Sequence, residues 1–195
     1  PAYLQQLVME SLGKSVRLDG APVGVATAPV LWGTTGTQGQ HAYFQALHQG
    51  TQAVPVEFVG VSRPARATDP AARAAHDDLV AAMFAQAAAL AFGTGGASGD
   101  PLAAHRATPG DRPSTTILAP ALTARTLGAL IALWEHRVVV QAAALGINPF
   151  DQWGVEVGKS LARDVRGAID GDAAATDALD GSTRALVERH RRSRA

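Results

Sequence analysis

The segment AVPVEFVGV, from Ala53 to Val61, is the part of the sequence that decides the fold class. It is short, apolar and rich in β-branched valine, which is typical of a β-strand. The segment STTILAP, from Ser114 to Pro120, is a further strand candidate, and a long helical pattern separates the two. Strands that alternate with helices predict an α/β fold with a mainly parallel sheet.

The helical pattern between these strands extends from Ala72 to Gly93. Its apolar stripe consists of Leu79, Met83 and Leu90, and Gly93 is placed to end the helix. Residues 93–114 are rich in Gly, Pro, Ser and Asp, and they predict a long loop.

Three further elements are expected upstream of Ala53. Apolar spacing predicts a helix over residues 2–12 that ends at Gly13, and HAYFQALHQG predicts a short helix over residues 41–50. The β-branched run from Val23 to Gly33 predicts a further strand, one that is buried on both faces. Three strands make a thin sheet, so we expect part of the sheet to be encoded upstream of Pro1.

The segment from Ala124 to Gly146 is a helical pattern that is too apolar for an ordinary surface helix. We expect one side of it to meet a core and the other side to meet a second chain or domain. A loop and a helix follow over residues 147–165, and an Asp- and Ala-rich tail begins at about Gly167. The terminal RHRRSRA is interpreted as a solvated tail rather than a nucleic-acid site.

The composition excludes several classes of function. Lys plus Arg and Asp plus Glu number 17 each, so no net charge attracts nucleic acid or an anionic membrane. The absence of cysteine excludes disulfides, thiol catalysis and thiolate metal sites, and it is compatible with a reducing cytoplasm. We find no signal peptide and no bilayer-length apolar span, and expect a soluble, cytoplasmic protein. The chain opens at Pro1, directly in a helical pattern, which suggests a processed or truncated chain.

Several polar residues are candidates for a site. Gln6 and Glu10 are four residues apart on the first predicted helix, so they share a face, although solvated helix surfaces have the same pattern. His41 lies where the Gly-rich GTTGTQGQ meets a helix, and that loop matches neither a P-loop nor a dinucleotide loop. Gln152 and Lys159 are seven residues apart on a predicted helix, two turns along the same face, although a surface lysine has the same pattern.

Taken together, four ordered blocks resemble the C-terminal part of the phosphoglucose isomerase family, also called glucose-6-phosphate isomerase. The resemblance extends from Pro1 to about Val165. The blocks are QQLVMES, WGTTGTQGQHAYFQALHQGTQAVPVEF, DRPSTTILAPALTARTLGALIALWEHRVVVQ and INPFDQWGVEVGK. The resemblance implies a three-layer αβα sandwich of the sugar-isomerase type, incomplete here, over residues 1–166. C-terminal helices or a flexible tail would then occupy residues 167–195.

The resemblance also implies an activity. The family interconverts glucose 6-phosphate and fructose 6-phosphate, in glycolysis and gluconeogenesis, through an enediolate and without metal or cofactor. By resemblance Glu10 is the base that moves the proton, and Gln6 and Gln152 are amides that bind the substrate. His41 resembles the histidine that helps open the sugar ring, and Lys159 the lysine that contacts the ring oxygen or a neighbouring hydroxyl. In the family the histidine comes from a partner subunit, so a homodimer is implied.

The sequence also departs from the family. Thr34 and Thr35 replace the usual acidic and proline residues, and Leu12 replaces the usual asparagine. Nothing in the sequence matches the family's phosphate-holding Ser/Thr loop or its enediolate-stabilising arginine. We therefore predict that the chain alone does not isomerise efficiently. The alternatives are a sugar-phosphate-binding module without catalysis and a dimerisation fragment that assembles through residues 125–145.

Overall fold

The structure of the chain is a computed structural model that describes residues 1–64 and 69–194. It divides into two compact units, each made of two segments. The first unit contains Pro1–Met9 and Pro29–Gln141, and the second contains Glu10–Ala28 and Ala142–Ala195. Ala195, the last residue of the predicted tail, lies outside the described residues.

The sheet of the first unit has two parallel strands, β1 (Val56–Arg63) and β2 (Ser114–Ala121). Val56 lies opposite Ser114 and Gly60 opposite Leu118 in the ladder. Parallel strands need a crossover connection, and the helix between them in sequence supplies it. Both predicted strands and the α/β class are confirmed.

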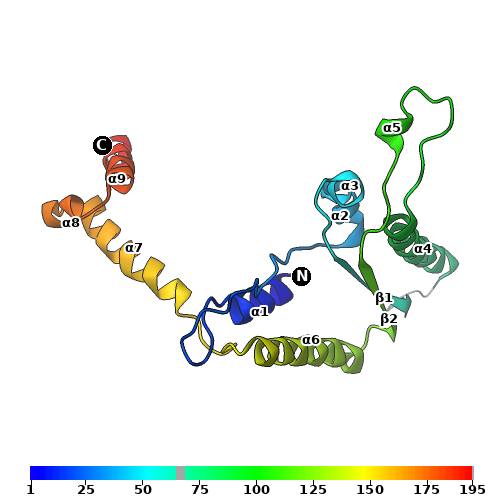
Figure 1. Ribbon diagram of the computed structural model, residues 1–195, viewed down its shortest axis with the longest axis horizontal. Coiled ribbons are helices and arrows are strands. Elements are labelled where there is room, and N and C mark those ends of the chain that lie inside the picture. Colours follow the sequence, from blue (N-terminus) through cyan, green and yellow to red (C-terminus); the bar gives the residue numbers. More distant parts are fainter. Residues whose placement is uncertain (65–68, 195) are drawn as a thin grey trace. The chain divides into compact units, whose positions relative to one another are not determined.

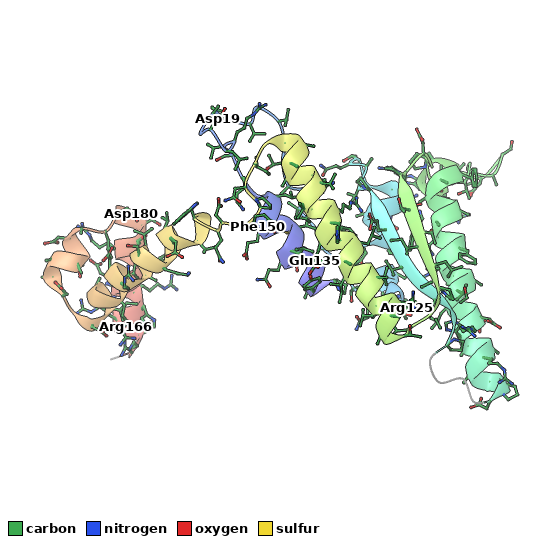
Figure 2. All side chains as sticks on the ribbon, turned by 90° about the horizontal axis from the view of Figure 1, so that it is seen from below. Asp19, Arg125, Glu135, Phe150, Arg166 and Asp180 are labelled. Carbon is green, nitrogen blue, oxygen red and sulfur yellow. The ribbon has the colours of Figure 1, made fainter. Side chains whose placement is uncertain are left out.

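The crossover helix is α4 (Pro70–Phe92), and it packs on both strands. Asp69 begins the helix by accepting a hydrogen bond from the Ala72 amide, and Gly93 ends it with a φ of 61°, which glycine adopts without strain. Figure 2 shows the strands between α4 and the helix α6 (Ala124–Leu145). An ion pair from Arg137 of α6 to Glu57 of β1 joins that second layer to the sheet.

The core of this unit lies where α4 and a short helix, α3 (Phe44–Gln49), meet the sheet. Phe44, Leu47 and Leu90 are all less than a tenth exposed. The partly buried residues packed against them are Tyr43, Val54, Val56 and Phe58. Leu90 and Met83 fit the predicted stripe of α4, but Leu79 does not, because its side chain is 58% exposed.

Two predictions about the first half of the chain are wrong. Residues 23–33 form no strand. The nearest β-type pairing in the described part of the chain is an isolated bridge between Val16 and Pro22, just before this segment. A β-branched run becomes a strand only where another strand pairs with it, and Val30 is instead 74% exposed. The helix predicted over residues 41–50 is two helices, α2 (Gly36–Ala42) and α3, separated at Tyr43.

The segment predicted as a long loop, residues 93–114, also contains structure. A short helix, α5 (Ala103–Arg106), lies within it, and an isolated bridge between Thr94 and Thr108 closes its base. The segment therefore extends away from the sheet, and the Thr94–Thr108 bridge joins its two ends. Figure 1 shows it beside α4.

The remaining elements are helices. The first is α1 (Ala2–Leu12), and the C-terminal ones are α7 (Gly154–Asp170), α8 (Ala173–Asp177) and α9 (Gly181–Arg194). Most of the described part of the predicted tail is therefore helical, and α7 packs against both α8 and α9. Over the described residues, no helix combines the length and the apolar character that crossing a membrane requires.

Candidate active site

The first candidate residues lie on α1, as predicted. Gln6 and Glu10 are one helical turn apart, and both side chains are exposed. Glu10 belongs to the last turn of the helix, where backbone carbonyls lack partners within the helix. The position of Glu10 therefore depends on which donors hydrogen-bond to these carbonyl oxygens.

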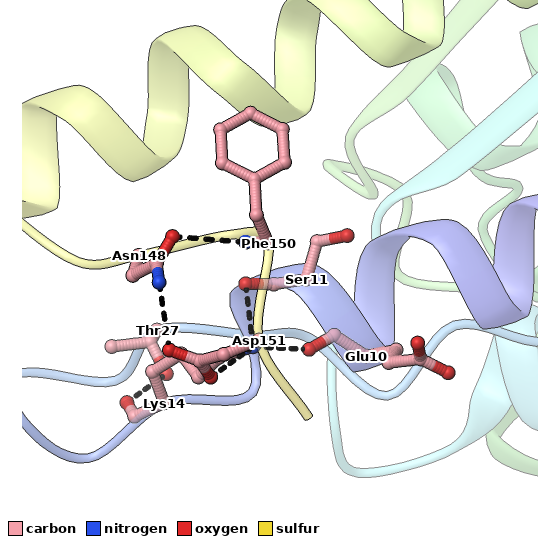
Figure 3. A network of polar contacts seen from close by, with 7 residues as sticks. All are labelled: Glu10, Ser11, Lys14, Thr27, Asn148, Phe150 and Asp151. Atoms are coloured by element: carbon pink, nitrogen blue, oxygen red, sulfur yellow. Dashed lines mark hydrogen bonds and ion pairs between the residues drawn. The ribbon is translucent and has the colours of Figure 1, made fainter. Parts of the chain in front are cut away.

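Lys14 is such a donor. Its Nζ donates hydrogen bonds to the carbonyl oxygens of Glu10, at 2.6 Å, and of Ser11, at 3.2 Å (Figure 3). A lysine that bonds the last carbonyls of a helix is a recognised way to end one, and its positive charge also complements the helix dipole. The Lys14 side chain is only 13% exposed, so the structure around it holds it in place.

The same ammonium group forms an ion pair with Asp151, which lies in the loop before α7 (Figure 3). Lys14 Nζ and Asp151 Oδ1 are 3.6 Å apart. Asn148 orients the carboxylate by donating from Nδ2 to Asp151 Oδ2 at 2.9 Å, and Asn148 Oδ1 accepts from the Phe150 amide. Thr27 donates from its hydroxyl to the Lys14 carbonyl oxygen at 2.9 Å. One polar network thus joins the end of α1 to the loop that carries Asp151.

Gln152 follows Asp151 directly. The pattern of the sequence had placed it on a helix with Lys159, but α7 begins only at Gly154, so that part of the prediction is wrong. The turn between Asn148 and Asp151 precedes the helix. Gln152 lies before the first helical residue, and its carbonyl oxygen accepts a hydrogen bond from the Val155 amide. An open hollow of about 270 Å³ lies here. It is lined by Phe150, Asp151, Gln152, Trp153 and Glu156.

Lys159 lies on the first half of α7. Its Nζ is 2.8 Å from Glu156 Oε1, and the two side chains are 62% and 57% exposed. Exposed pairs of this kind contribute at most about 1 kcal/mol, so the ion pair does not hold the ammonium group away from other partners.

His41 lies on α2, and its side chain is exposed. The hydroxyls of Thr34 and Thr35 both donate to Gln38 Oε1, at 2.6 and 3.1 Å, which fixes the entry to this helix. Gly39 is buried beneath Tyr43, where an added Cβ would lie 2.6 Å from the tyrosine hydroxyl. The Gly-rich segment predicted as a loop is therefore helical from Gly36 onward, and His41 lies within that helix, α2.

The candidate residues are divided between the two compact units. Glu10, Gln152 and Lys159 belong to the second compact unit, whereas Gln6 and His41 belong to the first. Among the described residues, no group of three or more His, Asp or Glu side chains is arranged to hold a metal ion.

Sequence reasoning missed Lys14 and Asp151. A signal for Lys14 was available, because a basic residue just past a helix end at Gly13 is a known capping pattern. Its pairing with Asp151 had no local signal, because the two residues are far apart in the sequence.

Comparison with known proteins identifies the family of the chain. The family model described as phosphoglucose isomerase matches residues 1–187. A glucose-6-phosphate isomerase from Corynebacterium efficiens is 50% identical over 199 aligned positions, which cover 99% of this chain and 36% of that protein. One from Polaromonas naphthalenivorans is 55% identical over 192 positions, covering 98% of this chain and 34% of that protein.

A solved structure agrees. The crystal structure of a glucose-6-phosphate isomerase from Chlamydia trachomatis superposes with a TM-score of 0.74 at 37% identity. The match covers 89% of this chain and 33% of that one. The chain spans about a third of the length of the relatives it matches. Since the family model covers nearly all of the sequence, the chain belongs to the phosphoglucose isomerase family.

Proposed function

We propose that this chain supplies catalytic groups to an aldose-ketose isomerase that interconverts glucose 6-phosphate and fructose 6-phosphate. One observation carries the proposal: the family match extends over residues 1–187, and every candidate site residue falls inside it. The relatives of this chain bear the name glucose-6-phosphate isomerase. Because the chain spans only about a third of those relatives, the activity is proposed for a longer protein to which these residues contribute.

In the proposed reaction Glu10 is the base. Its carboxylate takes the proton from C2 of the open-chain aldose, and the C2–H electron pair forms the C1–C2 double bond of an enediolate while the C1=O π pair moves onto O1. The C1–C2 π pair then takes the same proton at C1, and an electron pair on O2 forms the C2 carbonyl of the ketose. The proton on O2 moves to O1, so C1 and C2 exchange oxidation levels within one molecule. The reaction therefore needs no external oxidant or reductant.

The other residues bind and orient the sugar. Lys159 is proposed to stabilise the ring oxygen or its neighbouring hydroxyl, and His41, from a partner subunit, to assist ring opening. Gln6 and Gln152 are proposed as amides that hold the substrate hydroxyls. Preorganised donors of this kind stabilise the charge that develops on oxygen in the transition state.

We further propose that residues 1–166 correspond to the C-terminal sugar-isomerase-type domain of the longer enzyme, with residues 167–195 as its tail. The chain lacks a recognisable phosphate-holding loop, so we expect no efficient turnover by these residues alone. The cytoplasmic location and the roles in glycolysis and gluconeogenesis stay predictions that depend on this assignment.

The test is a chimera in which this chain replaces the aligned third of the Corynebacterium enzyme. The chimera should convert fructose 6-phosphate to glucose 6-phosphate, and Glu10→Gln should lower its kcat by about 10²- to 10⁴-fold, as expected for loss of a general base. Glu188→Gln is the matched control, since that carboxylate lies on α9 and is half exposed. An active chimera that is insensitive to Glu10→Gln would exclude Glu10 as the base.

The 195-residue chain alone separates the alternatives. We expect no turnover from it. Measurable affinity of a non-catalytic chain for fructose 6-phosphate, combined with an inactive chimera, would favour a sugar-phosphate-binding module instead.

A homodimer is proposed as the assembled form. Several large apolar side chains of α6 are well exposed, an arrangement typical of surfaces that meet another protein. They are Leu127, Ile131, Leu133, Val139 and Val140. We expect the chain to sediment as a dimer and Leu133→Glu to shift it to a monomer. A wild-type chain that stays monomeric would contradict assembly through this helix.

A further inference from the structure

We propose that Lys14 and Asp151 form a clasp that positions the Glu10 carboxylate relative to Gln152. Neither residue is assigned a role in the reaction above, and we infer that both act as positioning residues. The inference rests on the proposed function, because it presupposes that Glu10 is the base.

The first half of the clasp is the bond from Lys14 to the residue that carries the base. Lys14 Nζ donates to the carbonyl oxygen of Glu10 itself, at 2.6 Å, and to that of Ser11. A charged donor makes a stronger hydrogen bond than a neutral one. The bond therefore fixes the peptide unit from which the Glu10 side chain projects, at the end of a helix that would otherwise fray.

The second half is the ion pair with Asp151. Asp151 Oδ1 lies 3.6 Å from Lys14 Nζ, and Asn148 fixes its other carboxylate oxygen, Oδ2, at 2.9 Å. The next residue along the chain is Gln152, the proposed substrate amide. A force that holds Asp151 on Lys14 thus also holds the backbone of Gln152 at a set distance from that of Glu10.

This ion pair differs from those that lie within a single helix. The pairs Lys159–Glu156, Arg166–Asp170 and Arg192–Glu188 are of that kind, and all their side chains are at least half exposed. Lys14 is only 13% exposed and Asp151 only 23%. Water screens a partly buried pair less, and loss of one partner leaves the other charge poorly solvated. The clasp is thus suited to holding geometry, whereas the exposed helix pairs are not.

The first test uses hydrogen exchange in the 195-residue chain. The amides of Val155 and Glu156 bond to the carbonyls of Gln152 and Trp153, so they report on the loop at the far side of the clasp. In Lys14→Cys we expect these amides to exchange about tenfold faster, because the loop loses its tether. Arg166→Met is the control: it removes an exposed ion pair of α7 and should leave both amides unchanged.

The chain offers a chemical rescue of this variant. It contains no cysteine, so the thiol introduced by Lys14→Cys would be its only one. Alkylation of that thiol with 2-bromoethylamine would restore an ammonium group at nearly the length of lysine. We expect the alkylated variant to recover the slow exchange. Exchange rates that are unaffected by Lys14→Cys would overturn the clasp.

The second test is kinetic and uses the chimera. We expect Lys14→Met and Asp151→Asn each to lower kcat by about 10- to 100-fold with KM changed by less than about threefold, since a small misplacement of a catalytic group slows the chemical step. Circular dichroism and a melting curve establish the folded fraction, so that kcat refers to folded enzyme. A purely structural role would lower the folded fraction and leave kcat per folded molecule unchanged, which would overturn the proposal.

The two proposals fail in different ways. An active chimera that tolerates Glu10→Gln contradicts the assigned base, whatever the clasp variants do. If Glu10→Gln abolishes turnover while Lys14→Met and Asp151→Asn keep the parental kcat, the isomerase assignment stands and the clasp is wrong.

Discussion

The sheet region, made of β1, β2, α3 and α4, and the C-terminal helical region, made of α7, α8 and α9, are stabilised in different ways. Large apolar side chains fill the core of the sheet region, with Leu90 at 1% and Leu47 at 4% exposure. In the helical region the buried side chains are small, Ala168 at 0% and Val187 at 4%. Hydrophobic stabilisation grows with the apolar area buried, so the sheet region gains more from its core.

The helical region depends more on local polar contacts. Asp172 and Asp180 accept hydrogen bonds from the first amides of α8 and α9, and exposed ion pairs lie along α7 and α9. Exposed ion pairs contribute little, while helix caps contribute more. Substitutions in the core should therefore decide the stability of the sheet region, and substitutions at helix caps should decide the stability of the helical region.

The largest effect is expected from Leu90→Ala. It opens a cavity in the core of the sheet region, so we expect the free energy of unfolding to fall by about 2 to 5 kcal/mol. Urea unfolding followed by tryptophan fluorescence measures this loss. Leu79→Ala on the same helix is the control, because Leu79 is 58% exposed and should cost less than about 0.5 kcal/mol. Equal losses in the two variants would contradict the burial of Leu90 in the core.

A smaller effect is expected from Val187→Ala in α9. Two methyl groups leave a buried site, which should lower the stability of the helical region by about 1 to 2 kcal/mol. Hydrogen exchange of the α9 amides measures the loss, and the β1 and β2 amides should not respond. The adjacent Leu186→Ala serves as the control, since Leu186 is 66% exposed. Faster exchange in the strands as well would show that the two regions unfold together.

The cap of α9 should respond to acid. Hydrogen bonds from the side chain and backbone of Thr183 hold the pKa of the Asp180 carboxyl below its ordinary value. A lowered folded-state pKa stabilises the fold above the ordinary value, and this stabilisation is lost as the pH falls through the folded-state pKa. We expect the Ser182 and Thr183 amides to exchange faster, relative to their intrinsic rates, over that acidic range. Asp180→Asn, which keeps a capping oxygen without the charge, should abolish this pH dependence.

The smallest effect concerns Tyr3 in the first compact unit. Its hydroxyl donates to Glu135 Oε1 at 2.8 Å, and this hydrogen bond, with burial and the carboxylate charge, raises the pKa of Tyr3. The neutral phenol is favoured in the folded state, so this contribution is present below the ordinary tyrosine pKa and is lost as the pH rises through the folded value. Ultraviolet titration in a Tyr43→Phe background measures Tyr3 alone, because the chain has 2 tyrosines. Glu135→Gln should lower the measured pKa, and an unchanged pKa would contradict the contact.

Local patterns were sufficient for much of the fold. The apolar run of β1, the helical period of α4 and the stop at Gly93 each depend on neighbouring residues, and all were predicted. The spacing of Gln6 and Glu10 follows in the same way from helix geometry. The run from Val23 to Gly33 was predicted wrongly, because strand formation needs a partner that local composition does not reveal.

The candidate site likewise contains features that local sequence predicts and a feature that depends on tertiary packing. Its individual residues were predicted from ordered sequence blocks, and α1 alone places Gln6 and Glu10 one turn apart. The link from Lys14 to Asp151 appeared only in the folded chain. An ion pair between residues so distant in sequence exists only when packing has brought their segments together, whereas helical spacing arises from the backbone of a single segment.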